Sequence, residues 1–210
     1  LLQLANAVYP LIEDAKPLEE ALGRYAEIYQ TRWHEMMATK LGLGAFESGD
    51  GELLESLGEM LRAVETDMTL FFRRLADIDV QNDDADRCRA LLDAYYDPAA
   101  VDPASEAGNN QRREINAWLE LYVHRARADG ATHEERRRRM NAVNPLYVMR
   151  NYLAQLAIDE ATNGNYGMIH ELLDAMRHPY DEQPGREELS AKRPDWARTR
   201  VGCSMLSCSS

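Results

Sequence analysis

Side chains that could support catalysis or ligand binding are spread along this 210-residue sequence without forming a catalytic motif. A phosphate-binding loop needs closely spaced glycines, a helix start and usually a lysine, and Gly42 and Gly44 have neither of these companions. The five histidines do not form the two-histidine helical pattern that binds zinc. A Gly-x-Ser-x-Gly turn and the catalytic motifs of protein kinases are missing as well. The sequence thus predicts no catalytic, cofactor-binding or metal-binding residue in this chain.

Charged side chains form two clusters, each with competing interpretations. Residues 77–86 are rich in aspartate but lack the central glycine and closing glutamate of a calcium loop, which favours a solvated loop or helix cap. Arg136–Arg139 form the basic block of the chain, which could bind a phosphate or an acidic partner. Glu134 and Glu135 each precede one of these arginines by four residues, the order that favours ion pairs on a helix surface. We therefore expect a solvated helix face, with the binding role as the alternative.

Two further pairs of residues are candidates for function, namely an arginine with an adjacent asparagine and two cysteines near the end of the sequence. Arg150 and Asn151 would point away from the apolar side of a predicted helix, where an arginine can hold a carboxylate or carbonyls of another domain. Capping or surface placement is the alternative for both. Cys203 and Cys208 lie near the end of the sequence, where a chain can bend to join them or to reach another cysteine. From their spacing alone, it is equally possible that both are ordinary thiols without a function. Arg150 and Asn151 are our docking candidates, and Cys208 and Cys203 our redox candidates.

Composition limits the classes of protein to which the chain can belong. It is 45% hydrophobic and 29% charged, which suits one globular unit or two small ones. The net charge of −12 would repel nucleic acid and anionic membrane surfaces, and no run of about 18 apolar residues predicts a membrane span. Three cysteines are too few for a disulfide scaffold and favour a reducing compartment. The sequence opens on Leu1 without a methionine or leader, so we expect a segment of a longer protein.

Helical spacing of apolar residues dominates the sequence, and alternation in steps of two is almost absent. The expected fold class is therefore all-α. Pro17 suits the first turn of a long helix that should end near Gly42, where glycines become frequent. An apolar stripe along this helix predicts one buried face, made of Leu18, Leu22, Tyr25, Tyr29, Trp33 and Met36.

Shorter apolar stripes and their start and stop signals predict the remaining helices. Asp67 and Thr132 are expected N-caps, Gly130 ends a helix, and Asn144 followed by Pro145 is a helix-start signal. We expect helices over residues 53–64, 70–78, 85–96, 115–129, 145–163 and 166–176. Prolines and a glycine in residues 97–110 predict a long loop, and residues 186–210 predict a polar, mobile C-terminal tail.

Several short segments of the chain, in order, resemble the selenoprotein O family of protein adenylyltransferases. These segments are Met37–Leu43, Asp67–Leu75, Trp118–Arg125, Met140–Pro145, Arg150–Tyr152, Pro179–Tyr180, Lys192–Ala197 and Cys208–Ser210. The resemblance spans essentially the whole chain, from the first of these segments to the last. The resemblance implies that residues 1–185 are the helical C-terminal lobe of a protein-kinase-like fold, followed by the tail.

The resemblance also carries an expected activity. The family is understood to bind ATP with Mg²⁺ or Mn²⁺ in a kinase-like domain and to transfer AMP to Ser, Thr or Tyr hydroxyls of proteins. Its ATP-binding lysine, metal-binding acids and glycine-rich loop would all precede Leu1. The segment itself would therefore bind no cofactor and be inactive alone, and its partners would be the upstream kinase-like domain and protein substrates. Cytoplasmic localisation is implied for a bacterial protein, or mitochondrial for a eukaryotic one.

The same resemblance supports a redox role for the last cysteine, Cys208. In some members the position matching Cys208 is selenocysteine, which implies redox chemistry and a bond to a cysteine of the missing catalytic part. Cys203 does not reproduce the tighter family spacing, so a local bond to Cys208 stays open. Two other classes of function are kept as alternatives, a non-catalytic helical interaction module and a thiol oxidoreductase that uses both cysteines.

Overall fold

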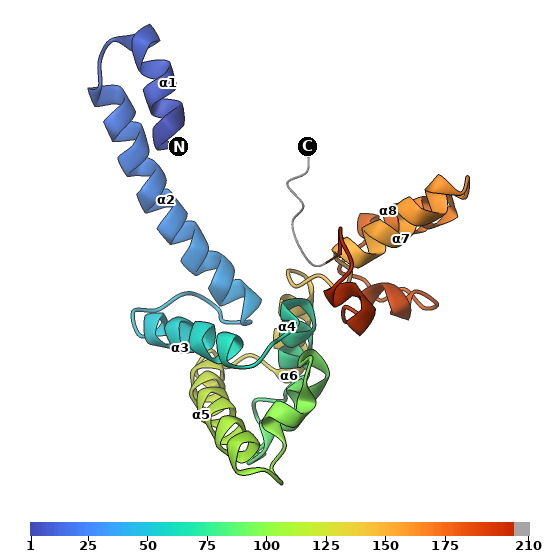
Figure 1. Ribbon diagram of the computed structural model, residues 1–210. Helices are drawn as coiled ribbons and strands as arrows, with labels where there is room; N and C mark the ends of the chain where they lie inside the picture. Colours follow the sequence, from blue (N-terminus) through green and yellow to red (C-terminus); the bar gives the residue numbers. More distant parts are fainter. Residues whose placement is uncertain (204–210) are drawn as a thin grey trace.

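The computed structural model describes residues 1–203, and this part of the chain is built from helices (Figure 1). Among these residues the β-structure is limited to one isolated bridge between Thr66 and Tyr95. The all-α prediction is therefore confirmed. A helical hairpin extends from a body that contains two hydrophobic cores, one around α3 to α6 and one around α7 and α8. None of the helices in the described range is long and apolar enough to cross a membrane.

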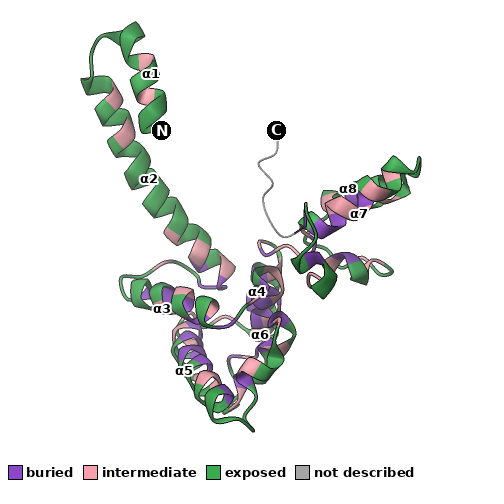
Figure 2. Ribbon diagram, viewed as in Figure 1, coloured by how far each residue is buried: buried purple, intermediate pink, exposed green. Residues whose placement is uncertain are grey.

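The hairpin consists of α1 (Leu2–Ile12), which lies back along the outer half of α2 (Lys16–Lys40). The length and C-terminal end of α2 match the prediction, with Pro17 in its first turn. The predicted burial of its apolar face is wrong for the middle of the helix, because Tyr25 is 51% and Tyr29 57% exposed, whereas Leu18 and Leu22 are half-buried. Contact with the first core is made by the C-terminal end of α2, where His34 stacks on Phe46 and Ala38 is buried (Figure 2).

The first core is formed by four α-helices that pack around a shared set of aliphatic and aromatic side chains. These helices are α3 (Asp50–Ala63), α4 (Met68–Asp77), α5 (Glu106–Ala128) and α6 (His133–Asn141). Phe71, Leu119 and Tyr122 have no exposed surface there. A 3₁₀ helix, η1 (Arg87–Ala94), packs on α4 and α5 where the sequence predicted an α-helix over 85–96.

Local capping residues begin and end these helices as predicted. The Asp67 carboxylate accepts the Leu70 N–H at the start of α4, and Gly130 has a φ of 66° just after α5. Thr132 and Glu135 form a capping box at the start of α6. These interactions span only three or four residues, so the sequence alone reveals them.

The predicted loop over 97–110 is shorter in the structure. It contains the 3₁₀ helix η2 (Pro98–Val101), and α5 begins at Glu106 because the Ser105 hydroxyl accepts the Gly108 N–H at 3.0 Å. A Cβ on Gly108 would lie 2.4 Å from the Asp102 carbonyl oxygen. Glycine here allows the close contact between α5 and the preceding turn, rather than marking a longer loop.

The second core contains α7 (Asn151–Thr162), α8 (Gly167–Arg177) and two short 3₁₀ helices, η3 (Glu187–Ser190) and η4 (Asp195–Arg198). The end of α7 near Asn163 and the span of α8 agree with the predictions. Leu189, Ala197 and Cys203 are buried against these helices. Residues 187–203 thus contribute side chains to the second core, and the predicted mobility of the tail stays a prediction.

The predicted helix start at Asn144 and Pro145 is wrong, since α7 begins six residues later at Asn151. The Asn144 side chain does not cap a helix. Its amide donates to the Lys40 carbonyl at 2.8 Å, and its Oδ1 accepts from Lys40 Nζ at 2.7 Å. Leu146 and Tyr147 then both donate their N–H groups to the Pro179 carbonyl, which holds this stretch out of a helix.

Candidate functional site

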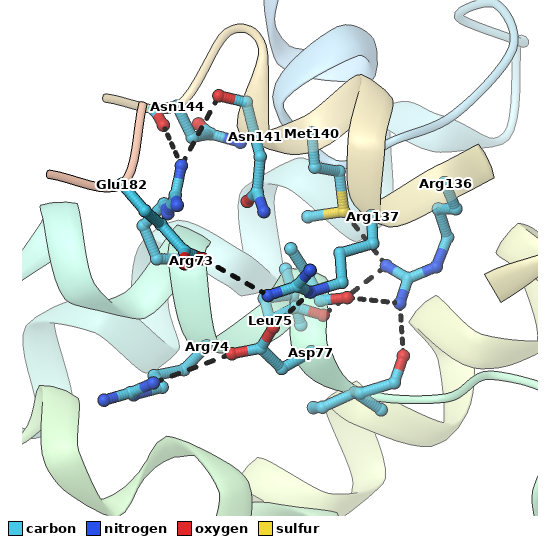
Figure 3. A network of polar contacts seen from close by, with 12 residues as sticks. Arg73, Arg74, Leu75, Asp77, Arg136, Arg137, Met140, Asn141, Asn144 and Glu182 are labelled. Atoms are coloured by element: carbon cyan, nitrogen blue, oxygen red, sulfur yellow. Dashed lines mark hydrogen bonds and ion pairs between the residues drawn. The ribbon is translucent and has the colours of Figure 1, made fainter. Parts of the chain in front are cut away.

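A cleft lined by three arginines lies between the two cores, with a volume of about 280 Å³ (Figure 3). Helix α4 contributes Arg73, Arg74 and Asp77 to it, and α6 contributes Arg137 and Asn141. The rim comes from the segment after α8, which includes Glu182, Gln183, Glu187 and Ser190. We call this site the arginine cleft.

Arg73 is the most buried of the three arginines, at 8% exposed. Its Nη1 makes only long contacts, of 3.5, 3.4 and 3.3 Å, to the carbonyls of Asn141, Asn144 and Tyr180. Within the described residues its Nε and Nη2 have no acceptor, and no carboxylate lies within 4.0 Å of it. Burial lowers the pKa of this guanidinium, and the charges of Glu182 and Asp77 partly oppose that effect. Arg73 is thus a nearly buried cation with unused donors.

The other two arginines share the Asp77 carboxylate, and Arg74 also pairs with Asp93, with 3.0 Å between Nη2 and Oδ2. Arg137 donates its Nε to Asp77 Oδ1 at 2.7 Å, and Arg74 Nη1 lies 3.6 Å from Asp77 Oδ2. Glu182 reaches toward Arg137 from the rim, with 3.9 Å between its Oε1 and Arg137 Nη2, and its side chain is 73% exposed. The η nitrogens of Arg137 therefore have one loose, solvent-exposed carboxylate near them.

Arg136 contradicts the predicted solvated face of the basic block, because it is 1% exposed. Its guanidinium donates to the Leu75, Ala76 and Ile78 carbonyls at the end of α4 and to the Tyr122 hydroxyl. Helix ends leave such carbonyls without partners, so Arg136 satisfies acceptors that would otherwise be buried and unpaired. Arg138 and Arg139 on the same helix are exposed, as predicted.

The predicted docking pair separates in the structure. Arg150 lies at the start of α7 and is paired with the buried Asp67, which also accepts the Tyr96 hydroxyl at 3.1 Å. It therefore joins the second core to the first within this chain. Asn151 is exposed. Its role, and any contact of this pair with another domain, stay predictions.

The redox candidates are only partly described. Cys203 is 4% exposed in the second core, and Cys208 lies outside the described residues. A third cysteine, Cys88, is fully buried, and its burial raises the pKa of the thiol to about 11. Neither described cysteine forms a disulfide within residues 1–203.

The apolar face of the hairpin is a second candidate surface. Along α2 it contains Ile28, Tyr29, Trp33 and Met36, which are 59%, 57%, 36% and 48% exposed. The N-terminal part of the hairpin also exposes large apolar side chains, and they are Leu1, Leu2, Leu4, Tyr9, Leu11 and Ile12. Exposed apolar surface of this kind is typical of a site of contact with protein. We call it the hairpin face.

Sequence reasoning missed the arginine cleft. Its arginines are Arg73, Arg74 and Arg137, and the sequence pattern indicated only Arg137, as part of a charge block. The available signal was Arg73 itself, a cation inside the apolar pattern of a predicted helix. Within residues 1–203 no group of three or more histidine, cysteine or acidic side chains could hold a metal ion.

Comparison of the sequence with known proteins identifies the family to which the chain belongs. The family model described as protein adenylyltransferase SelO matches residues 1–177. Proteins named protein nucleotidyltransferase YdiU are similar over the whole chain, at 50% identity in Aromatoleum aromaticum, 49% in an Azoarcus species and 47% in Rhodopirellula baltica. The chain spans 38% of the length of the first two relatives and 40% of the third. The chain therefore belongs to the SelO family, a family of protein nucleotidyltransferases.

Proposed function

We propose that the chain is the helical C-terminal part of a protein adenylyltransferase, which transfers AMP from ATP to Ser, Thr or Tyr hydroxyls of proteins with Mg²⁺ or Mn²⁺. Family membership over residues 1–177 supports the reaction class. The residues that bind ATP and the metal ion would lie in the catalytic part of the longer protein, outside this chain. Its task is to support the catalytic part that makes up the rest of the longer relatives. We expect the protein to work in the cytoplasm.

The observation that carries this role is the hairpin face. Burying a large apolar side chain stabilises a contact by about 1.5–3 kcal/mol, and this face leaves several such side chains uncovered. Helix α2 is too long and too exposed to be stabilised by α1 alone, because most helical stability comes from packing of an apolar face. A partner that covers the face completes the fold. We propose that this partner is the kinase-like domain that the family resemblance predicts upstream of the chain.

The activity is tested by joining the chain to the upstream region and measuring transfer of labelled AMP from ATP to protein. The joined protein should label substrate and the 210-residue chain should not. Labelling by the isolated chain would contradict this division of labour. Absence of labelling by a folded, joined protein would contradict the proposed reaction.

The docking role is tested separately by replacing Tyr29 and Trp33 with serine. Aromatic residues at the centre of an interface typically contribute 2 kcal/mol or more, so binding of the separately expressed upstream domain should weaken about 30-fold or more. Glu20 and Glu27 lie on the opposite side of α2 at 100° per residue, and their replacement by serine is the matched control. Equal effects of the two pairs would exclude the hairpin face as the contact.

A non-catalytic helical module is the alternative, and the same proteins distinguish it. A self-contained module should be monodisperse alone and unchanged by the upstream domain. A supporting lobe should self-associate through the hairpin face and become monodisperse when that domain is added.

A further inference from the structure

The arginine cleft contains donors that the protein itself does not use. Arg73 has two nitrogens without an acceptor in the described residues, and Arg137 donates only its Nε, to Asp77. These two guanidinium groups come from different helices, α4 and α6, and line the same cavity (Figure 3). A third polar group, Asn141 Oδ1, is buried in the cleft wall without a hydrogen-bond partner. Together they form an incomplete polar site.

The chemistry of these groups indicates the kind of ligand. Guanidinium groups bind phosphate and carboxylate oxygens in bidentate pairs, and such charge-assisted bonds are about twice as strong as neutral ones. A buried cation without a counter-ion, such as Arg73, is stabilised by an anion that enters its site. The unpaired oxygen of Asn141 requires a donor beside the anion, such as a hydroxyl.

Glu182 marks the position that an anion would take. Its carboxylate points toward Arg137 but stays 3.9 Å from Arg137 Nη2, and the Glu182 side chain is 73% exposed (Figure 3). An exposed pair at this distance contributes little, so a ligand can displace it. Asp77 is held by Arg137 and Arg74 and stays in place. The cleft thus has one fixed carboxylate and one that can move away.

We propose that the arginine cleft binds a small phosphorylated molecule, whose phosphate contacts Arg73 and Arg137 and whose neighbouring hydroxyl donates to Asn141. The cavity of about 280 Å³ accommodates a phosphate with a short polyol, and Gln183 and Ser190 add polar groups at the rim. Since the cleft lies between α4 and α6 of the first core and the segment after α8, the ligand would also fasten the two cores together.

Binding is tested by titrating the intact protein with glycerol 3-phosphate in low-salt buffer and measuring heat or the ³¹P resonance. Saturable binding is expected, and acetate at the same concentration should not compete. Arg137→Gln should weaken binding about tenfold or more, because one charge-assisted contact is lost. Arg139→Gln removes the same charge from an exposed position of the same helix and should leave the affinity unchanged.

Glu182→Gln provides a test whose expected result, tighter binding, could not be caused by misfolding. Removing the competing carboxylate should tighten binding about two- to fivefold, whereas a damaged site would bind more weakly. Arg73→Gln should abolish binding, with circular dichroism as a check on folding. The proposal is overturned if glycerol 3-phosphate does not saturate, if Arg137→Gln and Arg139→Gln act alike, if Glu182→Gln binds less tightly, or if acetate competes equally.

Discussion

Replacement of Asp67 measures how strongly the two cores are joined. Its carboxylate is 4% exposed and has three partners, the Leu70 N–H, the Tyr96 hydroxyl and the Arg150 guanidinium. Loss of an N-cap costs about 1 kcal/mol, and breaking a buried ion pair by removing one partner costs about 3–5 kcal/mol. Asp67→Ala should therefore lower the free energy of unfolding by about 4 kcal/mol. Urea unfolding followed by circular dichroism at pH 7 gives this value.

Two comparisons separate the ion pair from the cap. Asp97 caps η2 through the Ala99 N–H without an arginine partner, so Asp97→Ala should cost about 1 kcal/mol or less. A double-mutant cycle of Asp67→Asn with Arg150→Met should give a coupling energy of about 2 kcal/mol. Equal losses from Asp67→Ala and Asp97→Ala, or a coupling energy near zero, would refute the view that this pair joins the cores.

The pH dependence of the same variant has a defined sign. Burial alone would raise the pKa of Asp67, but hydrogen bonds from Arg150, the Leu70 N–H and Tyr96 hold it below its ordinary value. A carboxyl whose pKa is lowered in the native state stabilises it above the unfolded pKa, and this contribution is lost as pH falls through the native pKa. The stability gap between wild type and Asp67→Asn should be constant near neutral pH and close in acid.

Two shorter predictions concern the first core. Gly42→Ala should destabilise the chain by about 2–4 kcal/mol in urea unfolding, because φ is 73° and the new Cβ would lie 2.7 Å from Met140 Cγ. A similar stability would show that Met140 moves freely. Cys88 should resist a thiol reagent at pH 8 in the native protein and react in urea, as mapped by mass spectrometry, since its thiol is buried and its pKa is raised to about 11.

The sequence predicted what depends on near neighbours and missed what depends on distant ones. The caps at Asp67 and Thr132 involve residues three positions away, so the local pattern identified them. Asn144 also has the side chain of a helix cap, yet it binds Lys40, which lies 104 residues earlier. That contact depends on the packing of α2 beside α6, which no local pattern contains.

The hairpin face is a second feature that the local sequence pattern could not predict. The apolar stripe on α2 predicted a buried face, yet Tyr25, Tyr29 and Met36 are exposed, because periodicity does not say which part of a protein covers a face. Within residues 1–203 the two ends of α2 are partly covered, at Leu18 and Leu22 and at His34 and Ala38, while its middle is exposed. The relatives are more than twice as long as this chain, and under the proposed function the additional part covers this face.

Two buried arginines near the end of α4 show how a structural cation differs from a candidate ligand-binding one. Arg136 uses both η nitrogens on fixed acceptors, namely carbonyls of residues 75–78 and the Tyr122 hydroxyl. Its remaining donor, Nε, has no hydrogen-bond partner among the described residues but is buried away from solvent, so an anion in the cleft could not reach it. Arg73 is nearly as buried but keeps two nitrogens without acceptors and makes only long contacts with the third. The unused donors, rather than the charge or its burial, are what distinguish the arginine cleft as a binding site.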